Sequence, residues 1–132
     1  MYLISETTPI SPKMIWAGRI LSAVPALLLI FSAVMKLTKA TPVMQGFVQF
    51  GYQESVIVGL GIVELACIIL YLVPRTAVLG AILLTGYLGG ATATHLRIGD
   101  PYFMPVLLGV LVWGGLYLRD AKIRALIPLQ QQ

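Results

Sequence analysis

Cysteine and histidine, on which many redox and metal sites depend, are almost missing from this sequence. Cys67 and His95 are the only residues of their types among 132. A lone cysteine excludes an intrachain disulfide and a CxxC pair, and with them dithiol redox chemistry. One cysteine and one histidine also cannot provide the four ligands of a structural zinc ion. We therefore expect no metal and no intrinsic cofactor, and we interpret Cys67 as a small buried apolar residue.

Charge is also scarce. Only 11% of the residues are charged while 58% are hydrophobic, and the mean hydropathy is +0.91. A soluble domain carries about 25% charged residues. The net charge of +4 does not indicate nucleic-acid binding, because the basic residues stand singly at the ends of apolar segments. That placement is typical of membrane helices, so the expected partner is the lipid bilayer.

Four apolar segments are long enough to cross a hydrocarbon core of about 30 Å. They cover residues of about 15–37, 56–73, 76–96 and 102–118. The first is predicted to be a retained span, since it contains Pro25 and no A-x-A cleavage site follows it. Short turns force neighbouring helices to run antiparallel. We predict an all-α protein: an integral membrane antiparallel four-helix bundle forming a single transmembrane domain over residues 1–132.

Two short segments are predicted to lie on the membrane surface. Between the first two spans, Val43, Met44, Phe47 and Val48 recur at helical spacing, which predicts an interfacial helix over about 42–50. A packed loop is the alternative. Residues 119–127 alternate basic and apolar side chains and are predicted to form an amphipathic tail.

The distribution of lysine and arginine predicts the orientation. With four spans, both termini share a side, and six basic residues fall on it against three on the other. This excess places both termini in the cytoplasm of a multi-pass protein of the plasma membrane, which in a bacterium would be the inner membrane. The six are Lys13, Arg19, Arg75, Arg119, Lys122 and Arg124, and the three are Lys36, Lys39 and Arg97.

Glycines and aromatic residues give two expectations about packing. Gly86 and Gly90 form a small-xxx-small pair, and more glycines follow in the last span, so tight helix packing is predicted there. Aromatic residues near span ends are typical of an interfacial belt. The residues in such positions are Trp16, Tyr71, Tyr102 and Tyr117.

Glu64 lies near the middle of the second span, where a carboxyl costs on the order of 2.5–3.5 kcal/mol to insert. It should therefore face the interior of the bundle. Gly61, Glu64, Ile68 and Tyr71 share one helical stripe, and we predict that this stripe points inward. Glu64 is then either a proton acceptor and ligand anchor or a neutral carboxyl bonded to a neighbouring helix. The sequence favours neither interpretation.

Further polar residues stand at the outer ends of the first and third spans. Lys36 closes the first span and His95 and Arg97 close the third, while Ser32 and Thr92 lie one turn deeper. Together they predict a polar funnel leading from the outer surface into the bundle. The plainer interpretation of Lys36 is that it extends to the interface.

Depth along the helices links this funnel to Glu64. Glu64 is predicted to lie roughly 12 Å below the level of Lys36, and Tyr87 near the depth of Glu64. Since a lysine side chain reaches only about 6 Å, we expect Glu64 to bond Tyr87, Ser32 or water instead of Lys36. Trp113 is also deep, and either lines a cavity or simply packs.

These residues form the candidate site. Glu64 and His95 are the candidate base and acid, and no residue is assigned to a metal. The candidate ligand-binding residues are Ser32, Lys36, Tyr87, Thr92, Arg97 and Trp113.

Several segments of the chain resemble a known family. They are GRILSAVPALLLIFSAVMKL (18–37), FGYQES (50–55), the stretch 71–101 and VWGGLYLRD (112–120). They are similar to the DoxX-like family of small four-span bacterial membrane proteins. Lys36, Glu64, Gly90 and His95 fall where such proteins tend to keep polar positions. DoxX is named from a subunit of a quinone-linked oxidase complex, so the resemblance implies association with membrane oxidoreductases.

Three functions follow as alternatives. The first is a membrane subunit, or a binding partner for a lipophilic ligand such as a quinone, that acts with a redox partner protein. The second is a stand-alone membrane enzyme that performs acid–base chemistry on a lipophilic substrate. The third is a non-catalytic scaffold or assembly factor. The sequence leaves the ligand, the partner and the oligomeric state open.

Overall fold

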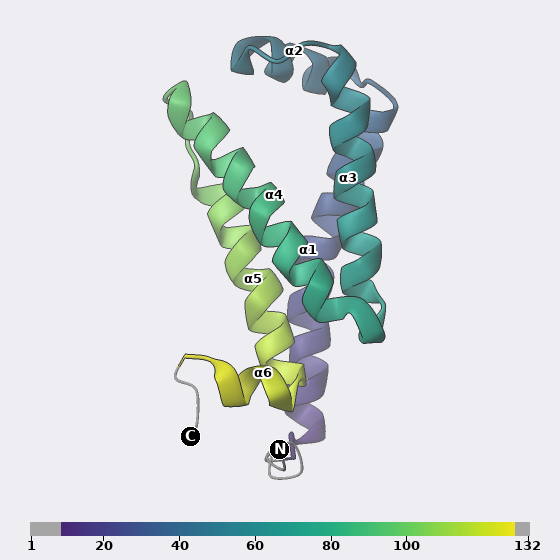
Figure 1. Cartoon of the computed structure of the whole chain (residues 1–132), viewed down its shortest axis with the longest axis vertical. Coiled ribbons are helices and arrows are strands. Elements are labelled where there is room, and N and C mark those ends of the chain that lie inside the picture. The colour runs from purple at the N-terminus through teal and green to yellow at the C-terminus, as the bar shows by residue number, and fades with distance from the viewer. Residues whose placement is uncertain (1–8, 129–132) are drawn as a thin grey trace.

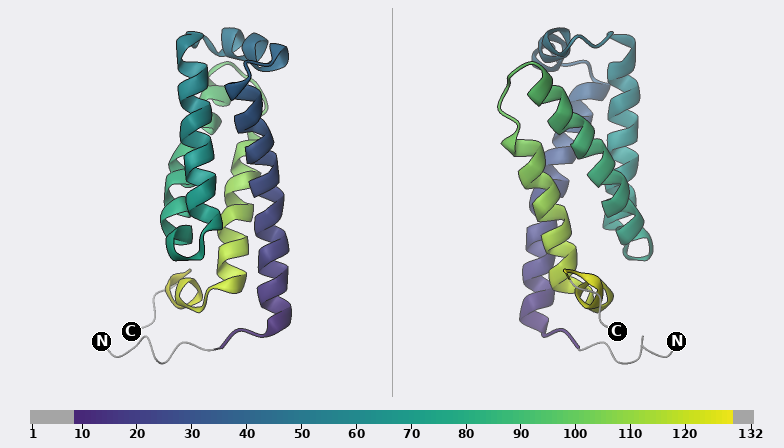
Figure 2. Two further views of the ribbon diagram at one scale, coloured as in Figure 1. Left: turned by 90° about the vertical axis from the view of Figure 1, so that its right-hand side faces the viewer. Right: turned by 60° about the vertical axis from the view of Figure 1, so that its left-hand side comes forward.

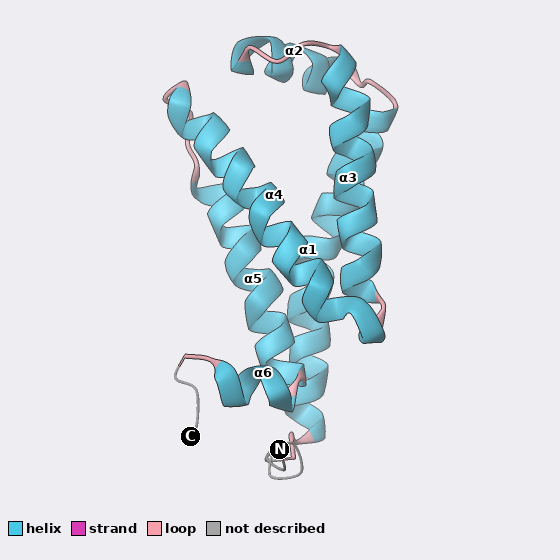
Figure 3. Ribbon diagram, viewed as in Figure 1, coloured by secondary structure: helices cyan, strands magenta, loops and turns pink. Residues whose placement is uncertain are grey.

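The protein is all-helical throughout the part of the chain that its structure, a computed structural model, describes, residues 9–128 (Figures 1 and 3). Within these residues a 3-10 turn, η2, joins two of the helices. The elements are α1 (Pro12–Leu37), α2 (Thr41–Phe50), α3 (Ser55–Leu72), η2 (Pro74–Thr76), α4 (Ala77–Arg97), α5 (Phe103–Arg119) and α6 (Ala121–Leu126).

Four of these helices form an antiparallel bundle, as the hydrophobic pattern predicts. α1 packs against both α3 and α5, and α4 packs against α3 and α5. The first and last described residues lie at one end of the bundle, beside α6, while α2 lies across the opposite end (Figures 1 and 2). We call these ends the α6 end and the α2 end.

The outer surface of the bundle is apolar on all sides, which is the signature of a membrane protein. Large side chains such as Ile20, Leu27 and Phe31 are more than 60% exposed. Among the described residues, α1, α3 and the stretch Pro74–Arg97 are long and apolar enough to span a membrane. α5 has 17 residues, or about 25 Å at 1.5 Å per residue, slightly less than a typical hydrocarbon core.

At the α6 end, the helices meet at very short distances. A Cβ added to Gly80 would lie 2.3 Å from the backbone nitrogen of Tyr71, and one added to Gly115 would lie 2.2 Å from Ser22 Oγ. Tyr71 is fully buried and donates toward Ser22 Oγ (2.8 Å) and the Val112 carbonyl (2.7 Å). The inward stripe on α3 is confirmed, and the prediction that Tyr71 belongs to an interfacial belt is wrong.

The α2 end is packed differently. A Cβ on Gly86 or Gly90 would meet nothing within 4 Å, so the prediction of tight packing at this pair is wrong. The close approaches fall instead on Gly18, Gly80 and Gly115. α2 confirms the predicted helix over 42–50, and Gly51 ends it in the left-handed conformation (φ 82°) that a glycine adopts without strain.

Candidate ligand-binding site

Glu64 is buried because of the way α3 packs against α1. One turn before it stands Gly61, where an added Cβ would lie 3.0 Å from Lys36 Cβ and 3.2 Å from the Ala33 carbonyl oxygen. The missing side chain lets the two backbones approach closely. This contact sets Lys36 at the level of Gly61 and directs the carboxyl of Glu64 toward α1, where it is 1% exposed.

Three polar side chains meet at this point. Lys36 Nζ lies 3.1 Å from Glu64 Oε1, and Ser32 Oγ donates to the same oxygen at 3.2 Å. Lys36 also donates to Ser32 Oγ at 2.5 Å. The lysine side chain is only 12% exposed. Mutual attraction and hydrogen bonding hold such a pair together. Removing one partner would leave the other charge buried and unpaired, which costs several kcal/mol.

The expected bond between Glu64 and Ser32 is confirmed, but the expectation that Glu64 does not pair with Lys36 is wrong. It assumed that the end of α1 is level with the start of α3. In the structure α3 extends beyond the end of α1, so Lys36 is level with Gly61, three residues from Glu64. Three residues span about 4.5 Å of helix, which a lysine side chain covers easily.

This trio lies on the wall of a cavity of about 410 Å³ at the α2 end. The cavity forms where α4 and α5 diverge from α1 and α3 (Figures 1 and 2). Its walls are mostly apolar, with polar groups at a few points. The polar lining residues are Ser32, Lys36, Tyr52, Glu64, Tyr87, Thr94 and His95, and the apolar ones include Leu29, Leu60, Leu88, Met104 and Leu108. We call it the α2-end cavity.

α2 and the residues after it cover one side of this cavity. Phe47 is 9% exposed and lies in contact with the ring of Tyr52, with centroids 5.6 Å apart. Phe50 stands edge-on to His95, with centroids 4.9 Å apart. The Tyr52 and Thr94 hydroxyls are 2.9 Å apart. These contacts hold α2 against the end of α4.

His95 is oriented by its own helix. Its Nδ1 lies 2.7 Å from the Ala91 carbonyl oxygen. Because a carbonyl only accepts, Nδ1 must donate in this bond. Both His95 and Glu64 line the α2-end cavity, but no hydrogen bond joins them among the described residues.

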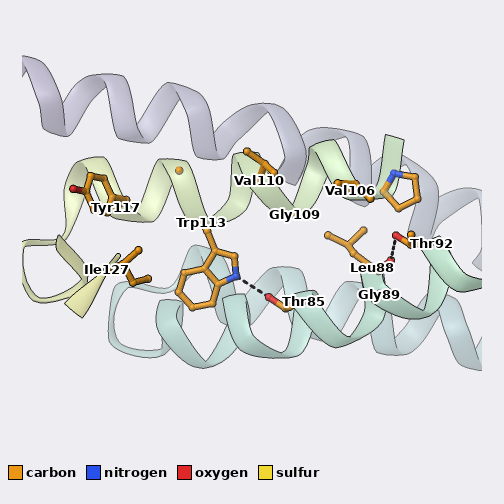
Figure 4. Close-up of a pocket in the computed structure, with 12 residues that line it drawn as sticks. Thr85, Leu88, Gly89, Thr92, Val106, Gly109, Val110, Trp113, Tyr117 and Ile127 are labelled. Carbon is orange, nitrogen blue, oxygen red and sulfur yellow. Dashed lines mark hydrogen bonds between the residues drawn. The ribbon is translucent and has the colours of Figure 1, made fainter. Parts of the chain in front are cut away.

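The remaining candidates lie elsewhere. Arg97 is at the rim, where its guanidinium donates to the Phe50 carbonyl and fixes the end of α2. Thr92 and Trp113 line a second pocket of about 600 Å³ between α4 and α5 (Figure 4). There Trp113 Nε1 donates to Thr85 Oγ1 at 2.7 Å. The structure thus brings Ser32, Lys36, Glu64, Tyr87 and His95 together, and it separates Thr92, Arg97 and Trp113 from them.

Sequence reasoning did not identify three further residues of the cavity lining, which are Phe50, Tyr52 and Thr94. The available signal was the turn after α2, where Phe50 and Tyr52 flank Gly51. A left-handed glycine reverses the chain there and returns both rings toward α4.

Comparison with known proteins adds a family. The family model described as the DoxX-like family matches residues 20–115, which include every residue of the cavity wall. No curated protein and no solved structure matches the chain significantly.

Proposed function

The chain belongs to the DoxX-like family, and we propose that it is a small membrane subunit that binds a lipophilic ligand in the α2-end cavity and serves an oxidoreductase partner. The observation that carries this proposal is the buried Lys36–Glu64 pair on the wall of an otherwise mostly apolar cavity. Ligand sites commonly combine apolar walls with a few polar groups that fix orientation.

The polar groups suit a head group that both accepts and donates hydrogen bonds. Lys36 is a donor, Glu64 is an acceptor when ionised, and Tyr87 has a hydroxyl that does either. Quinones and quinols offer such a head: the carbonyl form accepts and the hydroxyl form donates. The apolar lining then takes the ring and the first part of the tail.

The partner follows from what the chain lacks. With one cysteine and one histidine in the sequence, no dithiol or bis-histidine haem site is available on this chain alone. A protein of this composition that handled a quinone would exchange electrons through a second protein. Co-purification of a dehydrogenase or oxidase from the native membrane would support this part of the proposal.

The test is direct binding of a decyl-substituted dimethoxy-methyl-benzoquinone to the purified protein in lipid nanodiscs. Glu64→Gln should weaken binding by about tenfold, which corresponds to roughly 1.4 kcal/mol. Glu54→Gln is the matched control, because Glu54 forms an exposed pair with Lys39 (3.6 Å) away from the cavity. Absence of binding by the native protein, or equal affinity of the Glu64→Gln protein, would contradict the proposal.

A stand-alone acid–base enzyme is the second candidate. Its support is the presence of His95, with Nδ1 anchored to Ala91, on the same cavity lining as Glu64. Turnover of a lipophilic substrate by the protein without a partner, abolished in His95→Gln while binding persists, would favour this function.

A structural role is the third. Every fully buried side-chain nitrogen and oxygen atom in the described part of the chain has a hydrogen-bond partner, and Ser32, Lys36 and Glu64 bond one another. If a Lys36→Met/Glu64→Leu double variant folds and retains full function in the cell, the scaffold interpretation is correct.

A further inference from the structure

One side of the α2-end cavity is bordered by glycine. Gly86 and Gly90, one turn apart on α4, both line the cavity and are exposed, and an added Cβ on either would meet no atom within 4 Å. On α3, Leu60 and Glu64 line the same cavity at the same spacing. We call the space between these two pairs the glycine window.

Other approaches to the cavity are obstructed. α1 packs against α3 at the level of the cavity, at Gly61, which closes the side between these two helices. The side of the cavity that faces α2 is covered by Phe47, which is 9% exposed, and by the hydrogen-bonded side chains of Tyr52 and Thr94. α3 and α4 approach to backbone contact toward the α6 end, at Gly80, and they diverge toward α2 (Figures 1 and 2). The glycine window therefore faces the lipid side of the bundle.

We propose, on the basis of the function proposed above, that the ligand is an amphiphile with one polar head and one long apolar tail, which enters sideways from the bilayer and leaves its tail in the glycine window. The cavity of about 410 Å³ is near the lower limit of the roughly 300–1,000 Å³ typical of ligand pockets. A head group and the start of a tail fill it. The rest of the tail stays in hydrocarbon, where no apolar surface is exposed to water.

The experiment compares two probes in nanodiscs: tail-less dimethoxy-methyl-benzoquinone and its decyl derivative. Gly86→Leu and Gly90→Leu should each weaken binding of the decyl probe by about tenfold and change the tail-less probe by less than about twofold. Gly59→Leu is the matched control, since Gly59 is an exposed helical glycine on α3 with open space around it and does not line the cavity.

The outcomes separate the two proposals. If the native protein binds neither probe, the proposed function fails. If it binds both and the window variants weaken both equally, or weaken neither, the proposed function stands and the sideways route is wrong. A second measurement needs no variant: a decyl probe with a diazirine at the first carbons of its tail should label Leu60 or its neighbours on α3. Labelling confined to α2 would also overturn the route.

Discussion

At the scale of single residues, Lys36 and Glu64 form a buried ion pair to which Ser32 is also bonded. Each is expensive to bury alone, and the contact of 3.1 Å with Ser32 alongside offsets that cost. A buried ion pair is not by itself a stabilising device, because apolar residues of similar size often do as well. Its presence in the wall of a cavity is therefore more readily explained by ligand binding than by folding.

This dependence predicts a strongly non-additive mutant cycle. Lys36→Met and Glu64→Leu should each destabilise the protein by about 3 kcal/mol, because each leaves the other group buried and unpaired. The double variant should recover most of that loss. Thermal unfolding in detergent measures all three variants. Additive losses in the double variant would show that the two groups are stabilised independently.

Much of this residue-scale arrangement could be predicted from the sequence. The cost of a carboxyl in a span is large enough to place Glu64 inward, and helical periodicity then brings Gly61, Ile68 and Tyr71 with it. The Lys36 contact could not be predicted in the same way. It depends on how far α3 is shifted along α1, and that shift is set by a backbone contact at Gly61 that no pattern in one helix reveals.

At the scale of elements, α4 is divided into two halves with different packing. Its first half meets α3 at backbone distance through Gly80, and its second half carries Gly86 and Gly90 in open space. The same residue type therefore has opposite roles on one helix. Sequence alone does not separate them, because the small-xxx-small pattern is equally compatible with contact and with a gap.

A pair of substitutions on α4 tests this division. Gly80→Ala should destabilise the protein by about 1–3 kcal/mol, because its Cβ would overlap the backbone of Tyr71. Gly86→Ala should be neutral or stabilising by up to about 1 kcal/mol, since alanine is the better helix former and nothing is displaced. Both are read from thermal unfolding. Equal losses at the two positions would mean that α4 is packed uniformly.

At the scale of the whole molecule, the bundle has one compact end and one open end. The hydrophobic pattern predicts the spanning helices and α2, because membrane spans are recognised by the length of their apolar runs and amphipathic helices by their hydrophobic periodicity. It does not predict which ends of the helices diverge. That depends on crossing angles, which arise from close contacts among Gly18, Gly80 and Gly115 together with the buried Tyr71.

The orientation in the membrane is the remaining large-scale prediction. Six basic residues on the side of the termini against three on the α2 side predict that both termini face the cytoplasm. Reporter fusions after Gln53 and after Gln132 should then report opposite sides, with the fusion after Gln132 cytoplasmic. An external signal from the fusion after Gln132, or the same side for both, would contradict this topology.

Because α3 and α4 touch at Gly80 and separate beyond it, a small tilt of α4 about this contact would change the width of the α2-end cavity. Gly80 would be the pivot of such a tilt, because the backbones of the two helices approach closely there. Gly90 lies ten residues beyond Gly80, which is about 15 Å along the helix axis. A tilt of only about 5° around this pivot moves Gly90 by about 1.3 Å, with no bend in the helix. The cavity would then accept head groups of somewhat different thickness, while the helix contacts at the α6 end stay unchanged.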